Sequence, residues 1–243
     1  MKIIEKIKNR NSDNHAYPIP TIVAFGDSVT QGCFEVYDNG DGSIRVVYDM
    51  KNAYHAYLSS LINEIFPYAA VTVVNAGISG DSTEGGLKRL SRDVISKNPD
   101  LVIVSFGLND CVVKGGEYAD TYAENLRKMF TEITSNGSEA IYMTPPMMCK
   151  SVRPEIEGEE LRKIAADVAK AQNAGLLDLY CEKGIAVAKE CGVTVCDLHK
   201  KWNDLAANGV DTDLLLSNYI NHPTREMTNL TARTLFDTMI ELK

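Results

Sequence analysis

Four short polar blocks, far apart in the chain, contain residues that could carry out nucleophilic chemistry. They are Ser28 in GDS, Gly80 in SGD, Asn109 in GLND and His222 in NHP. A serine hydroxyl is a poor nucleophile unless a base takes its proton, and histidine suits that task at neutral pH because its unperturbed pKa is about 6.5. A tetrahedral intermediate also needs hydrogen-bond donors, which a glycine backbone and an asparagine NH₂ can supply without adding charge.

Each of these residues also has a simpler interpretation when it is taken alone. Ser28 could cap a following helix, and Gly80 and Asn109 are common turn residues. His222 could be an exposed loop histidine. The glycine-containing loop around Gly80 could hold a phosphate, but no Lys-Ser or Lys-Thr pair follows it as a P-loop requires. The functional interpretation therefore depends on the four blocks acting together.

The blocks can meet only if the intervening chain forms a sheet that brings their strand ends to one edge. Five short, nearly continuous apolar runs indicate strands covered on both faces, as in a parallel sheet: 21–25, 71–75, 101–106, 140–144 and 193–197. Segments with helical spacing lie between and after them: 53–66, 84–96, 118–134, 159–190 and 224–242. The stretch 173–175 is a candidate break in the fourth segment. This order predicts a three-layer α/β/α sandwich with a doubly wound, mainly five-stranded parallel sheet, similar to flavodoxin.

The chain reads as one domain over residues 1–243, with an N-terminal extension at 1–20. Turn residues at 38–42 between two β-prone pieces predict a hairpin insertion at 33–51, beside the serine turn. We expect this hairpin and the 144–158 loop to form the rim of any pocket. In that loop, Met147 and Met148 either line the pocket or pack beneath the loop.

Charge and hydropathy limit the partners and the location of this chain. It has a formal net charge of −8 and a sequence pI near 5.1, so it offers no basic field for nucleic acid or an anionic membrane surface. We find no signal-peptide-like segment in the first twenty residues and no apolar run long enough to insert in a membrane, so we expect a cytoplasmic protein that acts on a small molecule. A homodimer is compatible with the sequence, which leaves the oligomeric state open.

Six cysteines are scattered along the chain, and we expect them to be buried thiols. The stretch from Cys191 through Cys196 to His199 contains three possible metal ligands, but their spacing matches no common zinc pattern. We therefore predict no metal.

The four blocks, in this order, resemble the SGNH (GDSL-type) hydrolase family of esterases and acylhydrolases. The resemblance covers residues 21 to 224, nearly the whole chain. It implies that Ser28 is the nucleophile and that His222 is its general base. It also implies an oxyanion hole formed by the backbone N–H groups of Ser28 and Gly80 with the side-chain amide of Asn109.

The chain departs from that family at one position. Most members place an aspartate three residues before the histidine, where it orients the imidazole, but this chain has Tyr219 there and no carboxylate within eight residues before His222. Three substitutes remain open: the Tyr219 main-chain carbonyl, an Asn218 or Asn221 side-chain oxygen, or a folded-back Asp213. We favour the carbonyl because it needs no rearrangement of the family's geometry.

The resemblance implies a serine esterase that removes a short acyl group, above all acetyl, from an oxygen ester of a small molecule such as a carbohydrate, with no cofactor. Thioesters and lysophospholipids stay open as substrates. The alternative from another class is a non-catalytic ligand-binding protein that has kept the hydrolase scaffold; the missing acid at position 219 favours it. A weaker alternative is a flavodoxin-like nucleotide binder.

Overall fold

A five-stranded, entirely parallel sheet forms the centre of the computed structural model, which describes residues 1–241. Its strand order is β4-β1-β5-β6-β7. The strands are β1 (Thr21–Gly26), β4 (Thr72–Gly77), β5 (Leu101–Ser105), β6 (Glu139–Met143) and β7 (Thr194–Cys196). Every residue of β5, and all of β1 after its first, is buried, which explains their continuous apolar character. The predicted fold class is confirmed.

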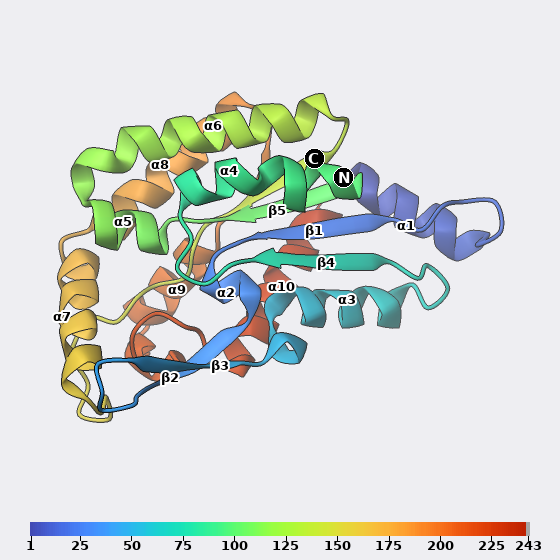
Figure 1. The fold of residues 1–243 in the computed structure, drawn as a ribbon. Coiled ribbons are helices and arrows are strands. Elements are labelled where there is room, and N and C mark those ends of the chain that lie inside the picture. Colours follow the sequence, from blue (N-terminus) through green and yellow to red (C-terminus); the bar gives the residue numbers. More distant parts are fainter. Residues whose placement is uncertain (242–243) are drawn as a thin grey trace.

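Helices cover both faces of this sheet (Figure 1). The helices α4, α6 and α8 lie on one side, and α3 and α10 on the other. The helices are α1 (Lys2–Ser12), α2 (Ser28–Gln31), α3 (Tyr54–Ile65), α4 (Thr83–Asp93), α5 (Leu108–Lys114), α6 (Ala119–Ser135), α7 (Glu159–Asn173), α8 (Leu176–Glu190), α9 (Leu198–Ala207) and α10 (Arg225–Ile240). Short 3₁₀ turns occupy Met50–Asn52, Ile95–Lys97, Gly116–Tyr118 and Thr212–Leu215.

The long helical segment expected at 159–190 is two helices, α7 and α8. The break falls at the stretch that the sequence marked, because Gly175 has a φ of +70°, a conformation that ends a right-handed helix. The N-terminal extension at 1–20 contains α1, whose Ile3 and Ile7 are fully buried in the same core as the sheet.

A separate two-stranded sheet formed by β2 (Cys33–Asp38) and β3 (Ile44–Tyr48) follows the serine turn. The strands are antiparallel, and they lie away from the main sheet, near α7 (Figure 1). In the 144–158 loop, Met147 and Met148 are almost fully buried, so they pack beneath the loop and do not line an open pocket.

The carboxyl ends of three strands meet at the point where the strand order reverses. Gly26 at the end of β1 is in register with Gly77 of β4 on one side and with Ser105 of β5 on the other. In open parallel sheets of this order, ligands bind outside the strand ends at that crossing point. Ser28 follows β1 directly and therefore begins its helix at the position where a binding site is expected.

Gly77 fits this crossing because α2 passes directly over it. A Cβ at position 77 would lie 2.2 Å from the backbone nitrogen of Gln31, a contact that only movement of the backbone can relieve. We expect Gly77→Ala to lower the free energy of unfolding by about 1–3 kcal/mol, measured by urea denaturation. Gly116→Ala is the matched control, because its Cβ would meet only Leu176 Cδ2 at 3.4 Å. Equal unfolding free energies for the two variants would contradict this account.

Candidate active site

Ser28 lies on the sharp turn between β1 and α2. The N-cap of α2 is Asp27, whose carboxylate accepts a hydrogen bond from the backbone N–H of Val29 at 3.0 Å. The capping role considered for Ser28 therefore belongs to its neighbour, and the Ser28 hydroxyl is left for another partner. Burial raises the pKa of Asp27 to about 7.

The partner of Ser28 is His222, from the opposite end of the chain. The Ser28 Oγ and His222 Nε2 atoms are 3.1 Å apart, and both residues are buried, with exposed fractions of 5% and 6%. On the other side of the ring, His222 Nδ1 lies 2.8 Å from the main-chain carbonyl oxygen of Phe34 in β2. A carbonyl can only accept, so Nδ1 carries the proton and the lone pair of Nε2 faces the serine hydroxyl.

The acceptor for His222 thus differs from every substitute that the sequence suggested. Asp213 accepts hydrogen bonds from the backbone N–H of Lys150 at 2.8 Å and from the Ser151 hydroxyl at 2.8 Å, so it holds the 144–158 loop. The Tyr219 carbonyl, the favoured candidate, is not the acceptor either. Tyr219 has a φ of +55°, in the left-handed region, so the chain turns sharply just before His222.

The two asparagines shape the histidine loop without contacting the ring. The Asn218 Oδ1 atom accepts hydrogen bonds from three successive backbone N–H groups, those of residues 220, 221 and 222, at 2.9–3.0 Å. The Asn221 Oδ1 atom accepts from the Asn218 Nδ2 atom at 3.1 Å. Asn218 therefore sets the backbone position of His222, while the ring orientation is set by β2.

Sequence reasoning missed Phe34 because a main-chain carbonyl has no residue-type signature. The available signal was indirect: the predicted hairpin at 33–51 begins just after the serine turn. A backbone acceptor from that hairpin could have been considered, but its alignment with a histidine almost 190 residues later depends on the folded structure.

Burial also controls the charge of His222. Loss of solvent lowers the pKa of the imidazole from 6.5 to about 4, while the Phe34 carbonyl and the nearby Glu35 carboxylate act in the opposite direction. A lowered pKa for a basic group means that the ring is neutral at every pH well above 4. At pH 7 the imidazole can therefore accept a proton from Ser28.

Gly80 and Asn109, the other two predicted site residues, are joined through the residue that follows Gly80. The Asn109 Nδ2 atom, on α5, donates to the main-chain carbonyl of Asp81 at 2.8 Å. Gly80 has a φ of +76°, and a Cβ there would meet no atom within 4 Å, so its surroundings are open. The Gln31 Oε1 atom of α2 accepts from the backbone N–H of Ser79 at 2.6 Å, which ties the Gly80 loop to the helix that begins at Ser28.

Buried ionic contacts fix the relative positions of these loops. The Arg89 guanidinium donates to Asp81 Oδ2 at 2.6 Å, to the Ala76 carbonyl at 2.6 Å and to the Gly26 carbonyl at 2.8 Å. It therefore joins the ends of β1 and β4 to the loop that follows Gly80. No local sequence pattern marks Arg89, because its role depends on where α4 lies in the fold.

Asp110, the residue after Asn109, fixes the same loop from the other side. Its carboxylate is fully buried and accepts hydrogen bonds from the backbone N–H of Thr83 at 3.1 Å and from the Thr83 hydroxyl at 2.5 Å. Its partner starts α4, so the second and third blocks share one hydrogen-bonded unit.

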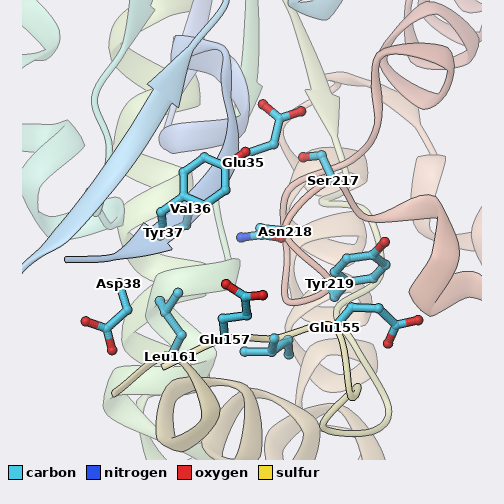
Figure 2. Close-up of a pocket in the computed structure, with 11 residues that line it drawn as sticks. Glu35, Val36, Tyr37, Asp38, Glu155, Glu157, Leu161, Ser217, Asn218 and Tyr219 are labelled. Carbon is cyan, nitrogen blue, oxygen red and sulfur yellow. The ribbon is translucent and has the colours of Figure 1, made fainter. Parts of the chain in front are cut away.

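A cavity of about 270 Å³ opens beside the histidine loop. Its walls come from β2, the 155–157 segment, α7 and residues 217–219 (Figure 2). Four carboxylates line it, namely Glu35, Asp38, Glu155 and Glu157, and no lysine or arginine does. Ser28 and His222 are not among its lining residues, but Glu35 follows Phe34 in the chain, and residues 217–219 precede His222. The two rim segments expected from the sequence are both present.

No cluster of three or more metal-ligating side chains was found among residues 1–241. The six cysteines are free thiols, and five of them are buried. None of the helices in this part of the chain combines the length and the apolar character needed to cross a membrane.

Comparison with known proteins identifies relatives of this chain. The model of the GDSL-like Lipase/Acylhydrolase family matches residues 24–228. An acetylxylan esterase of Geobacillus stearothermophilus is 30% identical over 132 residues, which cover 51% of this chain and 58% of the relative. An arylesterase of Vibrio mimicus is 38% identical over 73 residues, 30% of this chain and 36% of the relative. An uncharacterized lipoprotein, YqeF of Bacillus subtilis, is 29% identical over 127 residues, 51% of this chain and 47% of the relative. The matched regions thus span only about a third to somewhat over half of these relatives.

Solved structures share the fold over most of the chain. The crystal structure of Axe2, an acetylxylan esterase from Geobacillus stearothermophilus, superposes with a TM-score of 0.68 at 22% identity, covering 92% of this chain and 95% of that one. A lipase/acylhydrolase from Enterococcus faecalis gives a TM-score of 0.66 at 23% identity, with coverages of 90% and 96%. At these identities the likeness concerns the fold.

The buried setting of His222 can be tested directly. We expect its ring to titrate with a midpoint near pH 4, because burial disfavours the imidazolium, and therefore to stay neutral between pH 5.5 and 8. NMR of the histidine ring protons across a pH series measures this, and the spectrum of His222→Gln assigns the signal. A midpoint between pH 6 and 7 would contradict the geometry described above.

Proposed function

The chain belongs to the GDSL-like lipase/acylhydrolase family, and we propose that it is a serine esterase that hydrolyses short-chain oxygen esters, above all acetyl esters. The observation that carries this proposal is the line of contacts from the Ser28 hydroxyl through both nitrogens of His222 to the Phe34 carbonyl. A neutral imidazole with its free lone pair directed at a serine hydroxyl is the arrangement that activates a nucleophile.

In the first half of the proposed reaction, His222 Nε2 takes the proton of Ser28 as Oγ attacks the ester carbonyl carbon. The carbonyl oxygen becomes an oxyanion, for which the backbone N–H groups of Ser28 and Gly80 and the Asn109 amide are the candidate donors. The C–O bond to the alcohol then breaks, and the imidazolium returns its proton to the departing oxygen. An acetyl-serine remains.

In the second half, water replaces the alcohol. His222 takes a proton from the water, the hydroxide oxygen attacks the acyl carbon, and the bond to Ser28 Oγ breaks. The proton passes from the imidazolium to the serine oxygen, and acetate leaves. The family relationship and the open surroundings of Gly80 support the oxyanion site.

The cavity supports a polyhydroxy alcohol as the leaving group. Carboxylate oxygens accept hydrogen bonds from sugar hydroxyls, and the tyrosine side chains at 37 and 219 add apolar surface (Figure 2). Neither Asp38 nor Glu157 has a cationic partner within residues 1–241, so a phosphate-bearing substrate such as a lysophospholipid would meet repulsion there. The relative named as an acetylxylan esterase favours the same substrate class.

The place of this activity in the cell remains a prediction. The sequence favours the cytoplasm, and one relative is named a lipoprotein.

The proposal predicts that two single substitutions abolish turnover. We expect Ser28→Ala and His222→Ala each to lower kcat on p-nitrophenyl acetate by at least about 10³-fold, because nucleophile and base act as one unit. Ser60→Ala and His15→Ala are matched controls at exposed positions and should retain full activity. A serine-directed phosphonate should label the wild type and His15→Ala, but not Ser28→Ala.

Two results would count against an esterase. They are the absence of wild-type turnover and phosphonate labelling, and turnover that survives both substitutions. Either result favours the non-catalytic binding protein.

The cavity makes a separate prediction about substrate choice. Because Glu157 has no ion-pair partner within residues 1–241, we expect Glu157→Ala to raise KM for an acetylated xylo-oligosaccharide by about 3- to 10-fold, the loss of roughly one hydrogen bond. KM for p-nitrophenyl acetate, whose leaving group lacks hydroxyls, should change less than twofold. Glu159→Ala, at an exposed carboxylate outside the cavity, is the control. Equal changes in KM for both substrates would show that the cavity does not bind the alcohol part of the substrate.

A further inference from the structure

The main-chain carbonyl that accepts from His222 lies on a two-stranded sheet that is only marginally stable by itself. Phe34 belongs to the β2–β3 ribbon, which makes no strand pairing with the main sheet, and isolated two-stranded ribbons are marginally stable in water. Every residue of β3 is exposed or only partly buried. A hydrogen bond of 2.8 Å from Nδ1 to this strand therefore needs contacts that hold the ribbon against the histidine loop.

Arg225 provides such contacts. It is the first residue of α10 and follows His222 by three positions. Its Nη1 and Nη2 atoms donate to the two carboxylate oxygens of Glu35 at 2.6 and 3.2 Å, and its Nε atom donates to Asp49 Oδ2 at 2.8 Å. The guanidinium carbon also lies 4.3 Å from the centre of the Phe34 ring. One side chain thus contacts the acceptor residue, the residue after it, and the residue that follows β3.

The geometry of this cluster is suited to fixing a position. A bidentate guanidinium–carboxylate pair defines orientation as well as distance, unlike a single contact to a lysine. Glu35 holds β2 next to the acceptor carbonyl, while Asp49 holds the chain just after β3. Arg225 is itself placed by the same turn that places His222, because Thr224 accepts a hydrogen bond from Met227 as the N-cap of α10.

The cluster also has a charge that favours the reaction. Two carboxylates and one guanidinium sum to −1, and one of these carboxylates, Glu35, directly follows the residue whose carbonyl accepts from His222 Nδ1. When the imidazole takes the proton of Ser28 it becomes a cation, which a nearby net negative charge stabilises. A neutral carbonyl by itself supplies orientation without that charge.

We propose that Arg225 is a positioning residue for acyl transfer, which holds the Phe34 carbonyl on His222 Nδ1 through Glu35 and Asp49. The cluster takes the place of the aspartate that most relatives carry before the histidine. This inference rests on the proposed esterase function.

The first experiment compares two arginines of the same helix. We expect Arg225→Met to lower kcat on p-nitrophenyl acetate by about 10- to 100-fold, with KM within twofold, because a small displacement of the base costs rate and not binding. The rate of labelling by a serine-directed phosphonate should fall by the same factor. Arg233→Met is the control, because Arg233 is exposed and, within residues 1–241, its side chain hydrogen-bonds only to Asn229; its kcat should stay within twofold of the wild type.

Conservative variants separate positioning from a general loss of stability. Glu35→Gln keeps an acceptor oxygen for Arg225, so it should lose less kcat than Glu35→Ala. Arg225→Lys keeps the charge without the bidentate fork, so its kcat should lie between those of the wild type and Arg225→Met. If Arg225→Met does not fold, these three variants decide the matter. A folded Arg225→Met or Glu35→Ala with wild-type kcat would overturn the proposal.

A second measurement does not depend on turnover. In ¹⁵N-labelled wild-type protein, we expect the His222 ring to show one tautomer, protonated at Nδ1, with a downfield hydrogen-bonded proton. In Arg225→Met this proton should move upfield and exchange with water at least about tenfold faster, while Arg233→Met leaves it unchanged. An unchanged proton in Arg225→Met would contradict the positioning role. If the proton responds as expected but the wild type hydrolyses no ester, the esterase function fails and the positioning of His222 stands.

Discussion

The hydrogen bond from His222 Nδ1 to the Phe34 carbonyl is the interaction on which the rest of the site depends. It fixes the tautomer, and the tautomer decides whether the Nε2 lone pair faces Ser28. Burial keeps the same ring neutral, because solvent is not available to stabilise the imidazolium. The orientation and the protonation state of the His222 ring therefore have separate physical causes. A single backbone acceptor sets the orientation, and the packing around the ring sets the protonation state.

The parallel sheet brings Ser28 to this histidine, and the loops around it are held by buried polar groups. Arg89 bonds to the ends of β1 and β4 and to Asp81, and Asp110 bonds to the start of α4. These groups would be costly to bury unpaired, so each of them fixes the loops that satisfy it. The Gly80 and Asn109 blocks are consequently parts of one hydrogen-bonded unit beside the serine turn.

The replacement of a family aspartate by a carbonyl changes the role of the hairpin. In a chain with an acid before the histidine, both groups lie in one loop and are positioned together. Here the acceptor lies on β2 and the histidine almost 190 residues later, so the contacts between the two segments become part of the proposed catalytic arrangement. The acidic cavity is lined by the same strand, so β2 carries both the acceptor that orients the base and part of the wall where the alcohol is proposed to bind.

The sequence by itself determined the fold class, the five strands and the four polar blocks, because each is written in local patterns: continuous apolar runs, helical spacing and residue types at strand ends. Ser28 and His222 were predicted as a pair from their types, and the structure brings them within hydrogen-bond distance. Tertiary structure alone decided what orients the histidine. Tyr219, Asn218, Asn221 and Asp213 were reasonable candidates because they are near His222 in sequence, but a main-chain carbonyl is present in every residue and has no signature. Which carbonyl meets Nδ1 depends on how β2 packs against the histidine loop, a contact between distant segments that no local pattern encodes.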